Sequence, residues 1–184
     1  TLTQLVVQSS FGKKVGVATI NELDDASLEK VVRRAEELAQ LAPENPEFVP
    51  NLGAQKYAES KTFVQSTAAI TPKLRADAVE KSLKIARENK VEAAGFWEDT
   101  TGYAAMMNSS GVFAYNTTTN VNFSVTVRTT DGKGSGYATR GYNDVTKLDT
   151  TKATQIATQK SLGSAAAKAI EPGKYTVIIE PAAV

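Results

Sequence analysis

VEAAGFWEDTTGYAAMMNSSGVFAYNTTTNVNFSVTVRTTDGKGSGYATRGY, residues 91–142, is the stretch that decides the fold of this chain. Fifteen of the 21 Thr and five of the six Tyr lie at or after residue 100, and both residue types favour strands. The stretch predicts five strands separated by residues typical of turns. Connections this short favour an antiparallel meander. The five predicted strands are 91–98, 103–108, 112–118, 121–129 and 135–142.

The residues before this stretch predict a hairpin and two helices. Segments 3–11 and 13–20 are rich in Val, Leu and Thr, and a glycine between them favours a tight turn. Apolar residues at helical spacing then follow Asp24 and Asp25, either of which can serve as the N-cap. A second helix is expected to begin at Thr71, which precedes a proline suited to the first helical position.

The residues after the stretch predict a third helix over about 149–170 and a last strand over 175–180. The complete order is strand-strand-helix-helix, then five strands, a helix and a strand. This order indicates an α+β fold, an antiparallel meander with flanking helices, rather than alternating βαβ units. We expect residues 1–60 to be the remainder of an amino-terminal α/β domain and residues 61–184 to form a middle domain.

The composition excludes several classes of protein. Hydrophobic residues make up 41% of the 184 residues and charged residues 22%, as in ordinary globular domains. The net charge of +1 gives no reason to expect nucleic acid or an anionic membrane as a partner. No segment has the roughly 18 consecutive apolar residues of a membrane helix.

The most informative feature of the composition is that the sequence contains no His and no Cys. A zinc site made of imidazoles or thiolates, a Ser-His-Asp triad, a Cys nucleophile and a disulfide framework are all excluded within these residues. The sequence therefore assigns no catalytic residue and no metal-binding residue, and its substrate-binding residues are unknown.

Three polar clusters have simple structural explanations. The loop from Asp131 to Gly136 lacks the glycine spacing of a phosphate-binding loop and lies between strands, so we interpret it as a hairpin loop. Glu98 and Asp99 are adjacent in a strand and should point to opposite faces. A helix cap accounts for the acidic pair at Asp24. A Ser–Lys dyad remains formally open, although no motif marks one serine as a nucleophile.

Aromatic residues of the strand region have two possible roles. They could form a stacking surface for bases or peptides, or they could pack in the core. Because the chain lacks a basic stripe, core packing is the interpretation that we favour. The residues concerned are Phe96, Trp97, Tyr103, Phe113, Tyr115 and Phe123.

Three segments in register resemble the TldD/PmbA (TldE) family, whose older label is modulator of DNA gyrase. Residues 13–24, KKVGVATINELD, resemble part of its amino-terminal domain. Residues 106–111, MMNSSG, are similar to a turn of its middle domain, and residues 171–181, EPGKYTVIIEP, are similar to the end of that domain. Family members are considerably longer, so the resemblance implies a fragment that lacks the carboxy-terminal domain.

The resemblance implies a bacterial or archaeal zinc metallopeptidase system that acts on small or unfolded peptides in the cytoplasm. Its TldD-type and PmbA-type subunits pair, so the expected partners are such a subunit or a second copy, together with a peptide substrate. In TldD-type members a His-Glu-x-x-x-His helix and a distant Cys hold the zinc, and none of these residues exists here. Zinc is expected only in the missing carboxy-terminal domain, and whether this chain is an enzyme stays open.

Residues 180–184, EPAAV, resemble the PmbA side of the family more than the TldD side. The first hypothesis is therefore a fragment of a TldD/PmbA-like subunit that is inactive alone, and free strand edges between residues 91 and 142 could receive an extended peptide. The alternative is a non-enzymatic module for peptide binding or subunit assembly. An independent Ser–Lys hydrolase is a third hypothesis.

Overall fold

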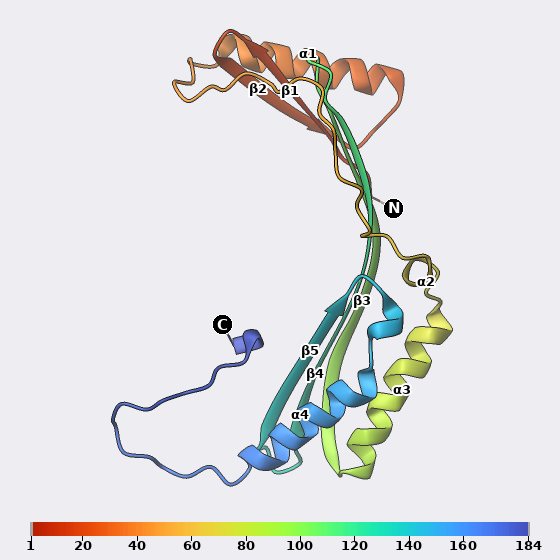
Figure 1. Cartoon of the computed structure of the whole chain (residues 1–184), viewed down its shortest axis with the longest axis vertical. Helices are drawn as coiled ribbons and strands as arrows, with labels where there is room; N and C mark the ends of the chain where they lie inside the picture. Colours follow the sequence, from red (N-terminus) through yellow and green to blue (C-terminus); the bar gives the residue numbers. More distant parts are fainter. Residues whose placement is uncertain (1, 184) are drawn as a thin grey trace. The chain divides into compact units, whose positions relative to one another are not determined.

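Two antiparallel sheets form, one in each of the two units into which the chain divides at Leu52 and Gly53. The computed structural model describes residues 2–183 (Figure 1). Helices accompany both sheets, and the strands of each sheet follow one another in sequence order. The α+β class and the antiparallel meander are therefore confirmed.

The first unit is a two-stranded hairpin covered by one helix. Strands β1 (Leu5–Phe11) and β2 (Lys14–Ile20) pair along their whole length through a two-residue turn. Helix α1 (Asp25–Leu41) begins where the carboxylate of Asp24 accepts a hydrogen bond of 3.0 Å from the backbone N–H of Ser27. Of the two acidic residues that could have capped this helix, Asp24 is thus the cap.

A glycine lets α1 approach β2 closely. A Cβ atom at Gly16 would lie 2.2 Å from the backbone nitrogen of Ala39 and 2.3 Å from the carbonyl oxygen of Ala35. Ala35 and Ala39 are themselves fully buried, so this face of α1 consists of small side chains. Helix and strand consequently pack backbone to backbone in the first unit.

The second unit is a three-stranded sheet with two helices against one face. Strands β3 (Val91–Met107), β4 (Phe113–Thr129) and β5 (Ser135–Tyr142) lie in this order. Helices α3 (Pro72–Glu88) and α4 (Thr150–Ser164) pack on the sheet. From Thr119 to Val127 every second residue of β4 is buried, as expected for the part of a strand that has one covered face. The buried residues of β4 are Thr119, Val121, Phe123, Val125 and Val127.

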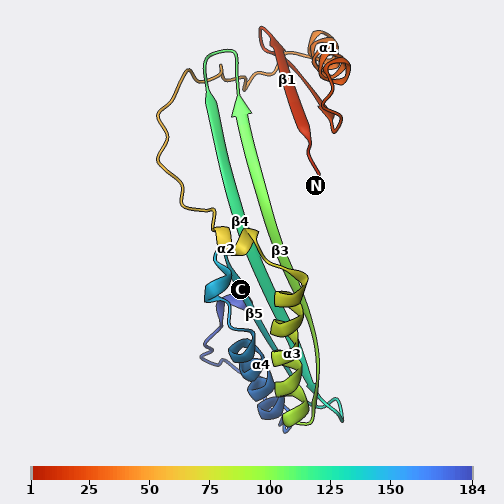
Figure 2. The same cartoon turned by 90° about the vertical axis from the view of Figure 1, so that its right-hand side faces the viewer.

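The β3–β4 hairpin is longer than the rest of its sheet. Its ladder runs without interruption from Val91 opposite Thr129 to Met107 opposite Phe113, whereas β5 pairs only with residues 121–128 of β4. Figure 2 shows α3 and α4 beside the part of the hairpin that β5 flanks. The remainder of the hairpin extends past these helices as a two-stranded ribbon.

This hairpin corrects the predicted number of strands. Four of the five predicted segments are halves of β3 and β4, so three long strands form instead of five. The residues at 99–102 and Asn120 are typical of turns, but here they face one another across the ladder, Asp99 opposite Val121 and Thr100 opposite Asn120. A regular partner strand therefore overrides their local preference.

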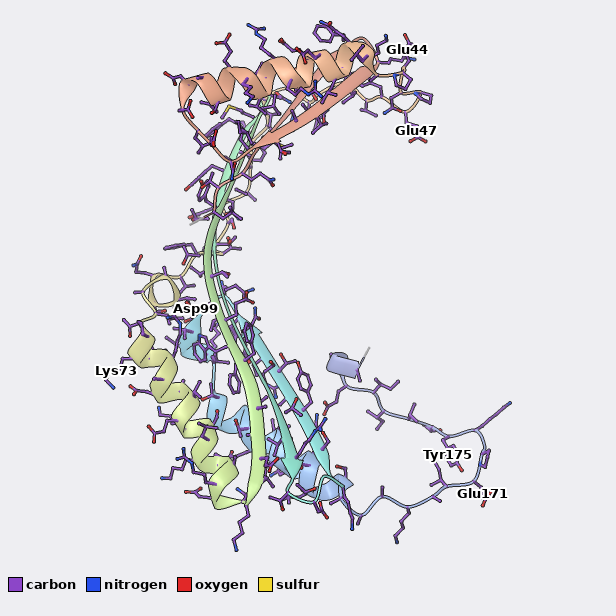
Figure 3. The ribbon with its side chains drawn as sticks, turned by 180° about the vertical axis from the view of Figure 1, so that it is seen from behind. Glu44, Glu47, Lys73, Asp99, Glu171 and Tyr175 are labelled. Carbon is purple, nitrogen blue, oxygen red and sulfur yellow. The ribbon has the colours of Figure 1, made fainter. Side chains whose placement is uncertain are left out.

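The carboxy-terminal part also departs from the prediction. Helix α4 ends at Ser164 rather than near residue 170, and residues 175–180 join no sheet among the described residues. The segment carries side chains that favour strands, but propensity alone cannot form a ladder without a partner strand. Figure 3 shows Glu171 and Tyr175 together at a bend, where the Tyr175 hydroxyl donates to the Glu171 carbonyl oxygen.

The predicted cap of α3 is confirmed, since the hydroxyl of Thr71 accepts a hydrogen bond of 3.2 Å from the backbone N–H of Leu74.

Three short helices complete the second unit. The short helices lie in segments for which the sequence predicted no helix. They are α2 (Gln65–Ala68), η1 (Val145–Lys147) and η2 (Pro181–Ala183).

Candidate functional site in the long hairpin

Exposed aromatic side chains gather on the part of the hairpin that extends past the helices. The interpretation of the aromatic residues as core is correct for Trp97 and Phe123, whose rings meet edge to face 6.4 Å apart. It is wrong for the other four, which are 54–63% exposed: three lie on the ribbon beyond α3 and α4, and Phe96 lies on the face of β3 opposite to Trp97. Those four residues are Phe96, Tyr103, Phe113 and Tyr115.

The register places most of these exposed side chains on the face that forms the core farther down the hairpin. Tyr103 lies opposite Thr117, Met107 lies opposite Phe113, and both pairs are an even number of residues from the buried pair of Trp97 and Phe123. The rings of Tyr103 and Tyr115 stack 6.5 Å apart at 28°. An apolar face thus continues from the core onto the ribbon, where no helix of this unit covers it.

A groove opens between the segment that precedes α2 and the ribbon, where residues of both β3 and β4 line it. Its volume is about 570 Å³, within the range of pockets that bind ligands. The groove takes its walls from three stretches of the second unit. They are residues 57–60, 104–106 and 114–117.

The preceding segment is attached to the ribbon at both ends of the groove. At one end the backbone N–H of Thr119 donates to the Thr62 carbonyl oxygen at 3.0 Å, and the Thr62 hydroxyl donates to the Thr117 carbonyl oxygen at 2.9 Å. At the other end the Cβ of Ala54 lies 3.7 Å from the position that a Cβ at Gly111 would take. Between these contacts the segment forms no strand.

The groove is almost free of charge. Residues 100–127, which include the whole ribbon, contain no Asp, Glu, Lys or Arg. Glu59 is the one charged residue among the described residues that line the groove. Tyr57, Met106 and Tyr115, all more than half exposed, give the walls an apolar character. The sequence analysis missed this site, although the uncharged run was a signal that could have located it.

The acidic pair of β3 does not form a reactive site. As predicted for adjacent strand residues, Glu98 and Asp99 belong to opposite faces of the sheet. Asp99 accepts hydrogen bonds from Arg75 Nε at 2.5 Å and Nη2 at 2.6 Å, and from Trp97 Nε1 at 2.8 Å. The hydrogen bonds from Arg75, more than that from Trp97, hold the pKa of Asp99 below its usual value. Figure 3 shows Asp99 on β3 near the start of α3.

The glycine-rich loop is a hairpin loop, as predicted. Residues 130–134 connect β4 and β5, and no helix follows the loop directly. The carboxylate of Asp131 accepts from the Thr129 hydroxyl at 2.7 Å and from the backbone N–H of Lys133 at 3.1 Å. The carboxylate thus organises the turn itself, and its pKa is lowered chiefly by the hydrogen bond from Thr129.

Neither a metal cluster nor a membrane-spanning helix occurs among the described residues. Across residues 2–183, the structure brings together no group of three or more His, Cys, Asp or Glu residues that could hold a metal ion. None of the helices described for these residues is both long enough and apolar enough to cross a membrane.

Comparison with known proteins identifies relatives of this chain. A family model for the PmbA/TldA metallopeptidase central domain matches residues 21–170. TldE from Thermococcus kodakarensis shares the fold with a TM-score of 0.79 and 17% identity, over 86% of this chain and 37% of that one. A proposed modulator of a DNA gyrase from Thermotoga maritima gives 0.81 and 17%, over 92% and 39%. No curated protein matches the sequence.

A second proposed modulator of DNA gyrase, from Bacteroides thetaiotaomicron, has a TM-score of 0.75 and 18% identity, over 94% of this chain and 42% of that one. At these identities the likeness concerns the fold. The chain spans about two fifths of the length of these three structures.

Proposed function

Because this chain belongs to the PmbA/TldD metallopeptidase family, we propose that it is part of a TldD- or PmbA-type subunit of a zinc metallopeptidase system that acts on small or unfolded peptides. The family match over residues 21–170 carries the proposal. Since the chain spans 37–42% of the solved structures that share its fold, the activity is proposed for whole subunits. The 184 residues alone are expected to be inactive.

The residues of this chain do not fit a zinc site. Zinc in proteins is held mainly by imidazole, thiolate and carboxylate groups that converge on one point. The sequence has no His and no Cys, and no suitable acidic cluster forms among residues 2–183. We therefore derive no catalytic step here and assign the zinc of the system to a carboxy-terminal domain of a TldD-type subunit.

The proposal includes the place of this chain in the assembly. Residues 1–60 would complete the amino-terminal domain, and residues 61–184 would be the middle domain next to the peptide path. A TldD/TldE-type subunit or a second copy is the proposed partner, and the cytoplasm is the proposed location. The resemblance to the family supports these assignments, with a lean to the PmbA side from residues 180–184.

A non-enzymatic peptide-binding or assembly module is the second candidate function. The nearly uncharged groove beside the ribbon favours it, since an apolar groove with a free strand edge can bind an extended chain without any catalytic group. The two candidates differ in one measurable property. A complex that contains a subunit of the peptidase system should bind zinc and hydrolyse peptides. A complex that contains only a binding module should do neither.

The experiment compares the native gene product, purified with its bound subunits, with the 184-residue chain alone. Both are incubated with quenched-fluorescent unstructured peptides, with and without a chelator, and their zinc is measured by mass spectrometry. The native preparation should contain zinc and cleave peptides, and the chelator should abolish cleavage. The chain alone should contain no zinc and cleave nothing.

Two results would contradict the proposal. Cleavage by the chain alone in the presence of chelator would place a metal-independent catalyst within these residues. Acylation of the chain by a serine-directed probe would then identify the Ser–Lys alternative. A native preparation with neither zinc nor cleavage would favour the binding module.

A further inference from the structure

We infer that the groove binds an extended, uncharged peptide segment as an additional strand on the edge of β4, at residues 113–117. The inference rests on the proposed role in peptide handling, and it names the site and the chemical class of the peptide. Three features support it: the direction of the backbone N–H and C=O groups of β4, the position of residues 54–62 beside β4, and the lack of charge on the ribbon.

The backbone of β4 presents hydrogen-bonding groups to the groove. The carbonyl oxygen of Thr117 and the N–H of Thr119 both point to the side on which residues 54–62 lie, because both bond to Thr62. In an antiparallel strand every second residue directs both its N–H and its C=O to the same side. Tyr115 and Phe113 therefore direct theirs to this side as well, along the wall of the groove.

Among residues 2–183, no strand of the sheet pairs with this edge beyond Val121. The pairing of β5 with β4 ends at Val121 opposite Tyr142, so β5 stops short of residues 113–119. Figure 2 shows β4 continuing beyond the end of β5. An edge of this kind is a template for an incoming strand.

The neighbouring segment frames the space for such a strand. Ala54 lies beside Gly111 and Thr62 beside Thr119, so segment and strand cover the same number of residues between their two contacts. Between these contacts the segment makes no ladder with β4 and instead forms the opposite wall of the groove. Because paired strands lie about 4.8 Å apart, an inserted peptide would bond to β4 on one side and meet the segment on the other.

The ribbon side of the groove favours an uncharged peptide, and Glu59 on the opposite wall is the one charged residue among the described lining residues. Placing a charged side chain against the neutral ribbon would cost desolvation energy with no opposite charge on the ribbon to offset it. On one face the peptide would meet the ring of Tyr115, which favours an aromatic or β-branched side chain. On the other face Ala114 is small and leaves room for an apolar side chain, which would lie near the exposed side chain of Met106.

The test measures binding of a dye-labelled octapeptide of alternating threonine and tyrosine, acetylated and amidated, to the 184-residue chain by fluorescence anisotropy. Tyr115→Pro removes an N–H that faces the groove and adds a ring at the edge, while the ladder with β3 stays intact. It should weaken binding at least about tenfold. Met107→Pro makes the same change opposite Phe113, on the other edge of the hairpin and outside the lining of the groove, and should leave binding unchanged.

Further measurements separate backbone from side-chain effects. Tyr115→Thr keeps the N–H and should weaken binding only about threefold. An octapeptide with N-methyl groups on alternate amides, or with two tyrosines replaced by glutamate, should bind at least about tenfold more weakly than the parent. In the unaltered chain the parent peptide should slow hydrogen exchange of the Phe113 and Tyr115 amides, which does not depend on how the variants fold.

Equal binding by the unaltered chain and Tyr115→Pro, together with unchanged exchange at Phe113 and Tyr115, would overturn the inference. So would sedimentation showing a dimer that Tyr115→Pro disrupts, because the occupant would then be a second copy. Neither result bears on the zinc and cleavage of the native preparation, which test the proposed function. Conversely, peptide binding in the groove without zinc or cleavage would uphold the inference and overturn the peptidase proposal.

Discussion

At the scale of single residues, Asp99 connects the start of α3 to β3. Its side chain is only 13% exposed and accepts hydrogen bonds from both Arg75 and Trp97. Asp99→Asn removes the negative charge and at least one favourable acceptor, so we expect the free energy of unfolding to fall by about 1–2 kcal/mol. The Arg75 side chain is 39% exposed, and solvent screening keeps the loss from being larger. Urea denaturation followed by the fluorescence of the single tryptophan, Trp97, measures it.

Asp77→Asn is the matched control for this change. Asp77 also pairs with a cation of α3, Lys73, at 2.8 Å, but both side chains are more than half exposed. An exposed pair of this kind contributes little to stability, so the urea midpoint should hardly move. Similar losses for the two variants would show that partial burial of Asp99 has no energetic consequence.

The pKa of the Asp99 carboxyl group also determines how the stability of the fold should depend on pH. The pKa of Asp99 is lowered in the folded chain, chiefly by the hydrogen bonds from Arg75. A lowered folded-state pKa gives stability that is present above the unfolded value of about 3.9 and is lost as the pH falls through the folded value. The urea midpoint should therefore fall between about pH 5 and pH 3. In Asp99→Asn this fall should be smaller, and an identical fall in both proteins would contradict the assignment.

At the scale of elements, the contact of α4 with β5 depends on glycine. A Cβ at Gly136 would lie 2.0 Å from the carbonyl oxygen of Ala157 and 2.6 Å from the backbone nitrogen of Ser161. Gly136→Ala should therefore lower the free energy of unfolding by about 1–3 kcal/mol, because the helix must move away from the strand. Urea denaturation of the purified variant measures this loss.

Gly163→Ala provides the opposite expectation in the same helix. A Cβ at Gly163 would meet nothing within 4 Å, and the residue is exposed. Alanine favours the helix over glycine, so this variant should gain about 0.5–1 kcal/mol. A higher free energy of unfolding in Gly136→Ala, or a lower one in Gly163→Ala, would mean that close packing does not control the stability of α4.

The elements also show what sequence patterns can and cannot predict. Caps and apolar periodicity placed the first two long helices well, because Asp24 and Thr71 act on neighbouring residues. The strand count failed because the partner that regularises residues 99–102 lies across the ladder at 118–121. The groove was not predicted for the same reason, since Tyr57 and Tyr115 come to line one groove only through the tertiary fold.

At the scale of the whole molecule, the two units should respond separately to mutation. Each unit has its own sheet, its own helix packing and its own buried residues. The division at residue 52 did not follow from the sequence, because residues 43–60 contain proline and glycine throughout and mark no single boundary. Trp97 belongs to the second unit, so its fluorescence reports on that unit.

Gly16→Ala tests this separation. The added Cβ would lie 2.2 Å from the backbone nitrogen of Ala39, so α1 and β2 cannot keep their contact. A two-stranded hairpin with one helix has little stability to lose, and a loss of about 1–3 kcal/mol should unfold much of the first unit. Circular dichroism should show reduced helicity, whereas the urea midpoint of Trp97 fluorescence should stay unchanged. Gly136→Ala should show the reverse pattern, and a coupled shift of both signals in either variant would mean that the two units unfold as one.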